Sequence, residues 1–444
     1  MSRGVNDLRT EKFTSDRYLH PRQISSRLKL HMDDPIVRAL SRAEALERTT
    51  SSGTILCLGS PPAGQQEFGI DLQIYAIGPR FGGIKMVPAG LHLVTWGTDL
   101  SRCGVFIALE GADVSVMQWD QKAETLVPVT EEEVAQRHAA AVRRMEHDAT
   151  LGPYPLATEP QWRELCGHIS VRVLRRALIP VGALVAPSSM DAEAFEKELE
   201  AAKKMMRPEE GSPAPGSPSP PMAREVRQGC APPPTHLDDD TGPVGAAFVT
   251  LDPKASGRAL SGAALSRFHL DKSEWLAQLL ASAYDEGTSA ESEAALLGEL
   301  ELAYLLFLRL SCLRSLEQWK ALVHLLLGCD QALREHPGLF SNFIAVLRAQ
   351  LALAPHDVFE SELTDDNFLR GALAGLADRT GEGACQGAAP LPPALTAELQ
   401  RLWAFLEAQF SLTVDSLRAS VLDEDDQPVV VLDEPLMLMT DGSD

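Results

Sequence analysis

The sequence predicts an α+β protein with two folded domains, the first rich in β-strands and the second all helical. Its 444 residues exceed the usual size of one domain, and 45% hydrophobic residues are enough for more than one core. Short runs of branched and aromatic residues, bounded by Gly, Pro or Asp, dominate residues 51–129. After residue 246, beyond a proline-rich stretch, apolar residues recur at helical spacing instead.

These patterns divide the chain into five parts. Residues 1–50 carry ten Lys/Arg and seven Asp/Glu, and we expect a variable, disordered extension there, with contact to RNA or an acidic protein as the alternative. A β-rich domain of sandwich or barrel type, with closing helices, spans 51–185. A Pro/Ser-rich linker covers 186–245 and a helical domain 246–420. The acidic segment 421–444 is expected to be a strand-forming tail.

Four strands are expected in the first domain, and apolar residues on both faces of the third indicate a central strand. They lie at 54–58, 91–96, 104–109 and 114–119. A capping box of Thr130 and Glu133 predicts a helix, and Thr158 is the expected N-cap of a second helix that contains Trp162.

The second domain is expected to contain five or more amphipathic helices. The stretch LLGELELAYLLFLRL, which ends at Leu310, is apolar on nearly every side, so we expect a buried helix. Expected helix starts are Asp271 with Glu274, Ser315 with Gln318, Ser341, and the pair Asp365 and Asp366 before Phe368.

Composition narrows the functional class. A net charge of −22 and a pI near 4.9 argue against broad nucleic-acid binding, which depends on Lys and Arg at phosphates. Seven cysteines without a CxxC pair favour a reducing compartment. The N-terminus shows no apolar signal region, and the most apolar segment is too short to span a bilayer. We therefore expect a soluble intracellular protein.

The glycine-rich stretch from Pro61 to His92 raises the question of a phosphate-binding loop. Such a loop needs a Lys followed by Ser or Thr, whereas Lys85 is followed by Met86. Turns explain the pattern better: Gly82-Gly83 and residues 88–90 are expected to be hairpin turns, with two phenylalanines packed beneath them. These are Phe68 and Phe81.

Signals for catalysis and metal binding are also missing. No GxSxG or HExxH motif occurs, and the eleven histidines show no paired ligand spacing. His92 and His324 are expected to be packed or surface histidines. We therefore expect no catalytic residue, no metal and no cofactor.

The terminal PVVVL, between acidic residues, suits β-augmentation, in which a peptide pairs with the edge of a partner's sheet. The alternative is a last strand that returns to the N-terminal sheet. The Ser-Pro steps at Ser212, Ser217 and Ser219 are expected to belong to a spacer, with phosphorylation as the alternative.

The stretch EFGIDLQIYAIGPRFGGIKMVPAGLH resembles the signature of the AAR-two splicing-factor family. LGPYPLAT at 151–158, LGELELAYLLFL at 297–308 with Trp319-Lys320, DNFL at 366–369 and PVVVL at 428–432 follow in the same order. The resemblance covers about 53–185 and 246–432. The signature residues, expected to be structural, are Phe68, Gly69, Asp71, Gly78, Pro79, Phe81, Lys85, Pro88, Gly90 and His92.

The resemblance implies a non-enzymatic assembly chaperone of the U-five snRNP that supports pre-mRNA splicing. The family binds the very large central protein of that particle before the spliceosomal helicase joins, and its helical domain resembles a VHS superhelix. By this resemblance the augmenting strand is Val429, Val430, Val431 and Leu432. We expect a monomer in cytoplasm and nucleus, associated with small nuclear RNA only indirectly, and with no membrane or DNA partner.

Two other classes of function remain open at this point. One is a VHS-like adaptor whose helical grooves bind many peptides. The other is a small-molecule enzyme with a site in the β-domain around Lys85 and His92.

Overall fold

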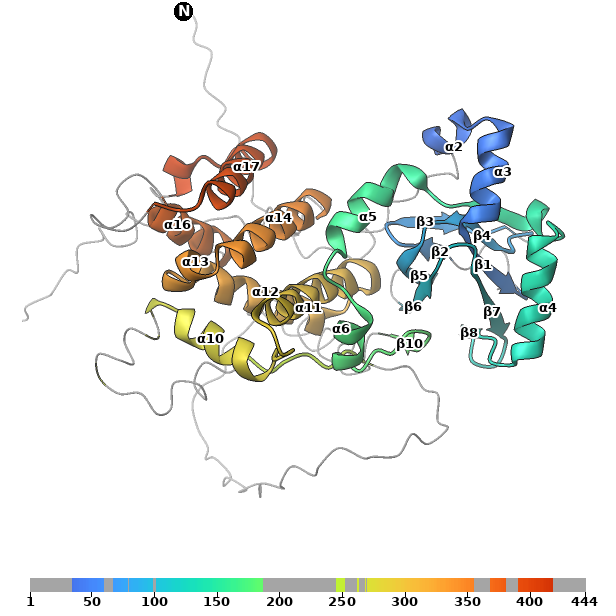
Figure 1. Cartoon of the computed structure of the whole chain (residues 1–444), viewed down its shortest axis with the longest axis horizontal. Helices are drawn as coiled ribbons and strands as arrows, with labels where there is room; N and C mark the ends of the chain where they lie inside the picture. The colour runs from blue at the N-terminus through green and yellow to red at the C-terminus, as the bar shows by residue number, and fades with distance from the viewer. Residues whose placement is uncertain are drawn as a thin grey trace, which may run out of the picture. The chain divides into compact units, whose positions relative to one another are not determined.

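The computed structural model describes residues 34–59, 67–78, 80–98, 101–186, 245–251, 262, 268, 270–354, 368–380 and 390–417. The chain forms two compact units. One comprises 1–249 with 301–318, and the other comprises 250–300 with 319–444. The predicted fold class is confirmed, since a β-sheet-rich N-terminal part is followed by a helical C-terminal part (Figure 1). The compact units divide close to the expected residue 246, but 301–318 belongs with the β-rich unit.

Within its described residues, the β-rich unit contains two five-stranded sheets. In the first sheet the strand order is β8-β7-β1-β4-β9, and in the second it is β10-β6-β5-β2-β3. The strands of the first sheet are β8 (Thr125–Pro128), β7 (Val114–Asp120), β1 (Gly53–Leu58), β4 (Gly83–Val87) and β9 (Leu151–Pro153). Those of the second are β10 (Leu184–Val185), β6 (Ser101–Leu109), β5 (Gly90–Thr98), β2 (Glu67–Ile70) and β3 (Gln73–Ala76).

All four strands expected from the sequence are present, as β1, β5, β6 and β7. The strand expected to be central, β6, has a neighbour on each side: it pairs along its whole length with β5 and over two residues with β10. Its apolar residues on both faces reflect this interior place.

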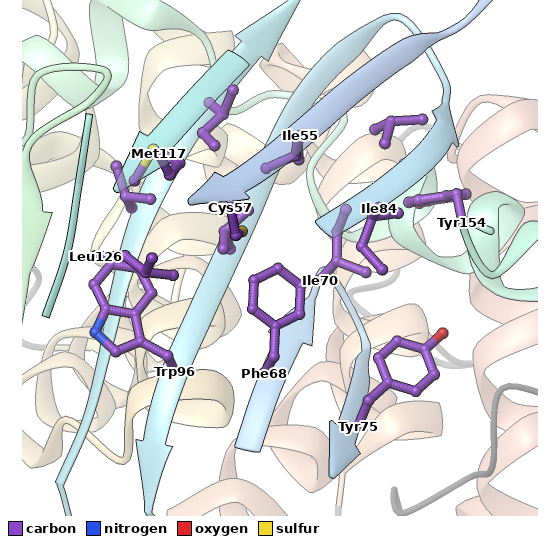
Figure 2. Close-up of a cluster of buried hydrophobic side chains, with 14 of the residues drawn as sticks. Ile55, Cys57, Phe68, Ile70, Tyr75, Ile84, Trp96, Met117, Leu126 and Tyr154 are labelled. Carbon is purple, nitrogen blue, oxygen red and sulfur yellow. The ribbon is translucent and has the colours of Figure 1, made fainter. Parts of the chain in front are cut away.

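One continuous core joins the two sheets, as in a β-sandwich. Figure 2 shows the ring of Phe68 from the second sheet near Cys57 from the first, and the indole of Trp96 near Leu126. All four side chains belong to one buried cluster. The indole N–H of Trp96 donates to Thr125 Oγ1 at 3.1 Å, which satisfies a polar group inside the core.

The expected hairpin turns are wrong, because β3, β4 and β5 alternate between the sheets. Residues 82–83 and 88–90 are therefore connections from one sheet to the other. Gly83 is needed for close packing: its φ is +127°, and a Cβ there would lie 2.0 Å from the carbonyl oxygen of Ile55. Phe68 and Phe81 do pack together as expected, with ring centroids 4.7 Å apart.

The prediction of a disordered extension through residue 50 is wrong for its last part. Helices α2 (Pro35–Ala39) and α3 (Arg42–Ser51) precede the first strand. Asp34 caps α2 and also accepts a hydrogen bond from the Ala157 amide at 2.8 Å. Ser41 and Glu44 form a capping box for α3. Val37 and Leu40 pack against the sandwich core, which accounts for the order of this segment.

Helices pack along the edges of the β-rich unit. Besides α2 and α3 they are α4 (Glu132–Arg143), α5 (Glu159–Leu165) and α6 (Val171–Arg176), with 3-10 turns η1 (Asp148–Thr150) and η2 (Leu156–Thr158). Helix α3 contacts β4 and α4 contacts β7, so both lie beside the first sheet (Figure 1). The Thr130 capping box is wrong, since Glu131 occupies the N-cap of α4 and no side chain caps it. Thr158 is the N-cap residue of α5, but its hydroxyl donates to the Pro155 carbonyl instead.

Helix α11 (Ser289–Leu310) is divided between the units, and residues 301–310 belong to the β-rich one. Every residue from Ala295 to Leu310 is buried, as the sequence predicts. Within the β-rich unit, Arg309 is only 1% exposed and donates to the carbonyls of Leu72 and Gln73, both at 3.3 Å. Burial lowers the pKa of the Arg309 guanidinium to about 9.

Gly69 makes room for this arginine. A Cβ at Gly69 would lie 2.2 Å from Thr95 Oγ1 and 3.0 Å from Arg309 Nη2. The glycine of the signature is therefore explained by the close approach of β5 and the buried guanidinium to β2.

The second unit is helical. Its elements are α10 (Ser273–Ser282), the first part of α11, the end of α12 (Leu313–Leu327), α13 (Gln331–Glu335), α14 (Pro337–Leu353), α16 (Phe368–Thr380) and α17 (Pro393–Phe410). Trp319 donates through Nε1 to Gln350 Oε1 at 2.8 Å, which ties α12 to α14. Asp271, an expected helix start, lies one position before Lys272, the N-cap residue of α10. Its carboxylate accepts from the amides of Ser273, Asp330 and Gln331 at the starts of α10 and α13.

Two of the expected helix starts in this region are wrong. Helix α12 begins at Leu313 and α14 at Pro337, so Ser315 and Ser341 lie inside helices rather than at their caps. The expected cap at Asp365 and Asp366 lies outside the described residues, as do most of the linker and the tail.

Arg309→Ala is expected to lower the free energy of unfolding of the β-rich unit by about 3 kcal/mol, because it leaves a cavity and removes both donors from buried carbonyls. Chemical denaturation with hydrogen exchange at β5 and β6 measures this. Arg314→Ala, at an exposed residue of α12, is the matched control and should change the value by less than about 0.5 kcal/mol. A loss equal to the control's would contradict a stabilising role for Arg309.

Candidate functional site

Residues of the family signature meet around the turn that joins β2 to β3. Asp71 begins this turn in the left-handed region, with φ of +52°, which aspartate tolerates better than most residues. Its side chain is fully buried. Phe68 and Gly69 lie on β2, and His92 lies on the adjacent strand β5.

The Asp71 carboxylate accepts three hydrogen bonds. His92 Nδ1 lies 2.7 Å from Oδ2, and the Tyr154 hydroxyl donates to the same oxygen at 2.6 Å. The Leu93 amide donates to Oδ1 at 2.9 Å, while the Asp71 amide donates to the Leu93 carbonyl at 2.8 Å. A buried charge is costly unless it is paired and hydrogen-bonded, and this one is both.

Both ring nitrogens of His92 lie within hydrogen-bond distance of oxygen atoms. Its second ring nitrogen, Nε2, lies 2.8 Å from the Pro88 carbonyl oxygen, which can only accept a hydrogen bond. Both ring nitrogens therefore need a proton. Burial alone would lower the pKa of His92, but the Asp71 carboxylate and the Pro88 carbonyl outweigh burial and raise it.

The cluster has the carboxylate–histidine part of a catalytic triad without its reactive end. In such a triad the second ring nitrogen carries a lone pair that takes a proton from a nucleophile. Here the Pro88 carbonyl occupies that nitrogen, and the ring is nearly buried. The arrangement can orient backbone and bind a proton, but it offers no base to a substrate.

Tyr154 is the member of this cluster that sequence reasoning missed as a site residue. It lies in the Pro-Tyr-Pro elbow of LGPYPLAT and is fully buried beside the core (Figure 2). Burial, together with the Asp71 charge, raises the pKa of its phenol. The quoted motif was a signal for the residue, but nothing local indicated its partner 83 positions away.

Lys85 does not join this cluster. Its ammonium pairs with Asp148 and lines a cavity of about 160 Å³ together with Arg143, hydroxyl residues and apolar residues. The hydroxyl residues are Thr49, Thr50, Ser52 and Thr54. His92 does not line this cavity. The structure thus separates the two residues around which a small-molecule site was considered.

The other signature residues either have a structural role or lie outside the described residues. Gly90 has a φ of +143° at the start of β5, a conformation that favours glycine. Pro88 supplies the carbonyl that holds His92, and Phe81 packs on Phe68. A Cβ on Gly78 would meet nothing within 4 Å, so packing does not explain this glycine. Pro79 and the predicted partner-binding residues Val429, Val430, Val431 and Leu432 lie outside the described residues.

Within the described residues, no group of three His, Cys, Asp or Glu side chains is placed to hold a metal ion. No helix in the described part of the chain is long and apolar enough to cross a membrane.

Comparison with known proteins decides the family. The model of the AAR2 N-terminal domain matches residues 51–179, and the model of the AAR2 C-terminal repeat region matches 248–415. The chain belongs to the AAR2 family. It is 28% identical over 343 residues to "Protein AAR2 homolog" of Homo sapiens, covering 74% of this chain and 83% of that protein. The Caenorhabditis elegans protein of the same name is 27% identical over 332 residues, covering 72% and 85%.

Membership of the AAR2 family supports a splicing-related function for the chain. The regions matched by the family models differ from the compact units in one respect. The C-terminal match includes residues 301–318, which fold with the β-rich unit.

Tyr154→Phe is expected to lower the free energy of unfolding of the β-rich unit by about 1.5–3 kcal/mol, because it removes a hydrogen bond to a buried carboxylate. Tyr75→Phe is the matched control: Tyr75 belongs to the same core, and its hydroxyl makes no hydrogen bond within the described residues, so little change is expected. Urea denaturation of both variants measures the difference. Equal stability of the two variants would show that the Tyr154 hydroxyl does not support Asp71.

The stability of the β-rich unit is expected to fall as the pH rises above 6.5, the ordinary pKa of histidine. The pKa of His92 is raised above its ordinary value of 6.5, so its contribution is complete below that value and is lost through the folded-state pKa. The Glu301 carboxylate raises the pKa of His168 in the same direction. Melting temperature against pH should therefore be flatter in His92→Gln than in the unmodified chain. Parallel curves would contradict a protonated His92.

Proposed function

We propose that this protein is a non-enzymatic assembly chaperone of the spliceosomal U-five snRNP. It binds the very large central protein of that particle and holds off the helicase until maturation. Family membership supports the link to splicing. The observation that carries the non-catalytic part is the buried cluster, in which His92 and Tyr154 are bonded to Asp71 and the His92 ring has no free nitrogen.

This observation bears on function because the signature residues serve the fold. A chain whose most characteristic side chains are buried and bonded to one another acts through its surface and its extensions. Two compact units and a tail on one chain can each bind the partner weakly. Because they are linked, each raises the effective concentration of the others, so the overall affinity can exceed that of any single contact by orders of magnitude. While these contacts are made, a competitor cannot bind the same surface of the partner.

The proposal assigns the tail residues Val429–Leu432 to a strand added to the partner's sheet. Their branched side chains favour extended backbone, and the flanking acidic residues limit pairing between copies of this chain. The tail lies outside the described residues, so this part rests on sequence.

Affinity purification from cell extract tests the proposal. The full chain is compared with a chain ending at Ser420, and bound proteins are identified by mass spectrometry. The proposal expects the full chain to retain the large U-five protein without the helicase, and the shortened chain to lose most of it. Retention of many unrelated proteins would favour the adaptor function, and retention of no spliceosomal protein would overturn the proposal.

Val430→Pro is expected to weaken binding to the purified large protein by about tenfold or more, because proline removes a donor from the strand ladder. Val430→Thr keeps both the amide and the branching and should bind like the unmodified chain. Titration by fluorescence anisotropy measures both affinities. If the two variants bind equally well, the tail does not dock as a strand.

A further inference from the structure

Lys85 is a signature residue whose side chain lines a cavity instead of joining the buried cluster. This cavity of about 160 Å³ lies within the β-rich unit, where the ends of α3 and α4 meet strands β1, β4 and β7 of the first sheet (Figure 1). An engineered protein cavity of ~150 Å³ binds benzene. A molecule of about that size therefore fits here.

Two hydroxyl groups on the cavity wall have no partner. Thr54 on β1 is only 3% exposed, and neither its hydroxyl nor that of Ser52 makes a hydrogen bond within the described residues. A buried hydroxyl without a partner is costly and needs an explanation. In contrast, the hydroxyls of Thr49 and Thr50 donate to carbonyls of their own helix. Ser52 and Thr54 are therefore the hydroxyl groups left to donate to a ligand.

The charged side chains at the cavity leave one positive charge over. Lys85 and Arg143 are two cations, and the Asp148 carboxylate, which pairs with Lys85, is one anion. The Arg143 guanidinium makes no hydrogen bond or ion pair within the described residues. An ammonium group has three donors, so the Lys85 ammonium can also donate to a second acceptor. A singly charged anion would balance these groups.

Both helices end at the cavity, and helix C-termini carry a partial negative charge. At the end of α4, however, the Met145 amide donates to the Val142 carbonyl at 2.8 Å and the Glu146 amide to the Ala141 carbonyl at 3.0 Å. At the end of α3, the Ser52 amide and two threonine hydroxyls donate to carbonyls of the last turns. Because internal donors already satisfy these carbonyls, the side-chain cations decide the sign of the site.

The rest of the wall is apolar and consists of Ala112, Val114, Val142, Met145 and Leu151. A largely apolar wall with a few polar groups, which fix the orientation of the ligand, is typical of small-molecule sites. A phosphate group carries a charge of about −1.5 to −2 at neutral pH and would leave the apolar wall uncovered. A carboxylate with a short hydrocarbon body matches both the charge and the wall, and arginine binds carboxylates well.

We propose that this cavity, here called the Lys85 cavity, binds the anion of a small carboxylic acid of about the size of benzene. Arg143 and Lys85 pair with the carboxylate, the hydroxyls of Ser52 and Thr54 donate to it, and the apolar wall covers the hydrocarbon body. The site binds without catalysis and goes beyond the proposed function, which assigns no small ligand. Because the ligand contacts α3, β1 and α4 together, its binding stabilises the β-rich unit.

The test titrates the full-length chain with isobutyrate and with isobutyramide, which has the same shape and no charge. NMR of labelled methionine methyl groups follows binding, because Met145 lines the Lys85 cavity, whereas Met117 belongs to the sandwich core. Inorganic phosphate is titrated in parallel. The variants are Arg143→Gln and Thr54→Val. Arg137→Gln is the matched control, because Arg137 is exposed on the same helix and does not line the cavity.

We expect isobutyrate to shift the Met145 signal to saturation, to leave the Met117 signal unchanged, and to bind about tenfold or more tightly than isobutyramide. Arg143→Gln should weaken isobutyrate binding by about tenfold and Thr54→Val by about fivefold, with Arg137→Gln unchanged. Without ligand, Thr54→Val should melt no lower than the unmodified chain, because the hydroxyl it removes has no partner in the fold.

Three results would overturn the inference. The first is a Met145 signal that isobutyrate does not move, and the second is equal binding of isobutyrate and isobutyramide. The third is tighter binding of inorganic phosphate than of isobutyrate, which would contradict the assigned class of ligand. Since Arg143 is exposed, weaker binding by Arg143→Gln cannot be ascribed to a lost core contact. None of these results affects the proposed function, which is tested by retention of the large protein.

Discussion

The buried carboxylate of Asp71 is the constraint on which the β-rich unit depends. It fixes the turn between β2 and β3 and bonds to His92 on β5 and to Tyr154 after β9, which brings strands of both sheets to one point. The backbone of the same turn accepts the Arg309 guanidinium from the end of α11. Removing any one partner takes a hydrogen bond from a buried polar group, so these contacts support one another.

This arrangement explains why a chemically suggestive motif belongs to a protein that we propose to act by binding. A carboxylate beside a histidine is typical of general acid–base sites. In this chain both ring nitrogens of His92 make hydrogen bonds inside the folded unit. Lys85 of the same motif pairs with Asp148 at a separate cavity. We propose that function lies instead on the surface of the folded units and in the tail.

Local patterns in the sequence predicted the fold class and the strands correctly, because apolar alternation and turn residues act over a few positions. They failed where the deciding contact is distant. Asp71 and His92 are 21 positions apart and meet Tyr154 and Arg309 from much further along the chain, so no spacing rule could join them.

Capping motifs failed for a different reason. Ser and Thr are common beside helix-forming sequence, and α12 and α14 begin before Ser315 and Ser341, whereas Ser41 and Glu44 do form a capping box. The assignment of residues 301–318 to the β-rich unit likewise depends on long-range burial.

The protonation state of His92 tests the central claim, that the signature residues serve the fold, most directly. Nitrogen NMR of histidine-labelled full-length protein at neutral pH distinguishes the two forms, and eleven histidines make assignment by a His92→Gln variant practicable. We expect a doubly protonated ring with both N–H groups protected from exchange with water. A neutral ring with an unprotonated Nε2 would contradict it, because that nitrogen would then be available as a base.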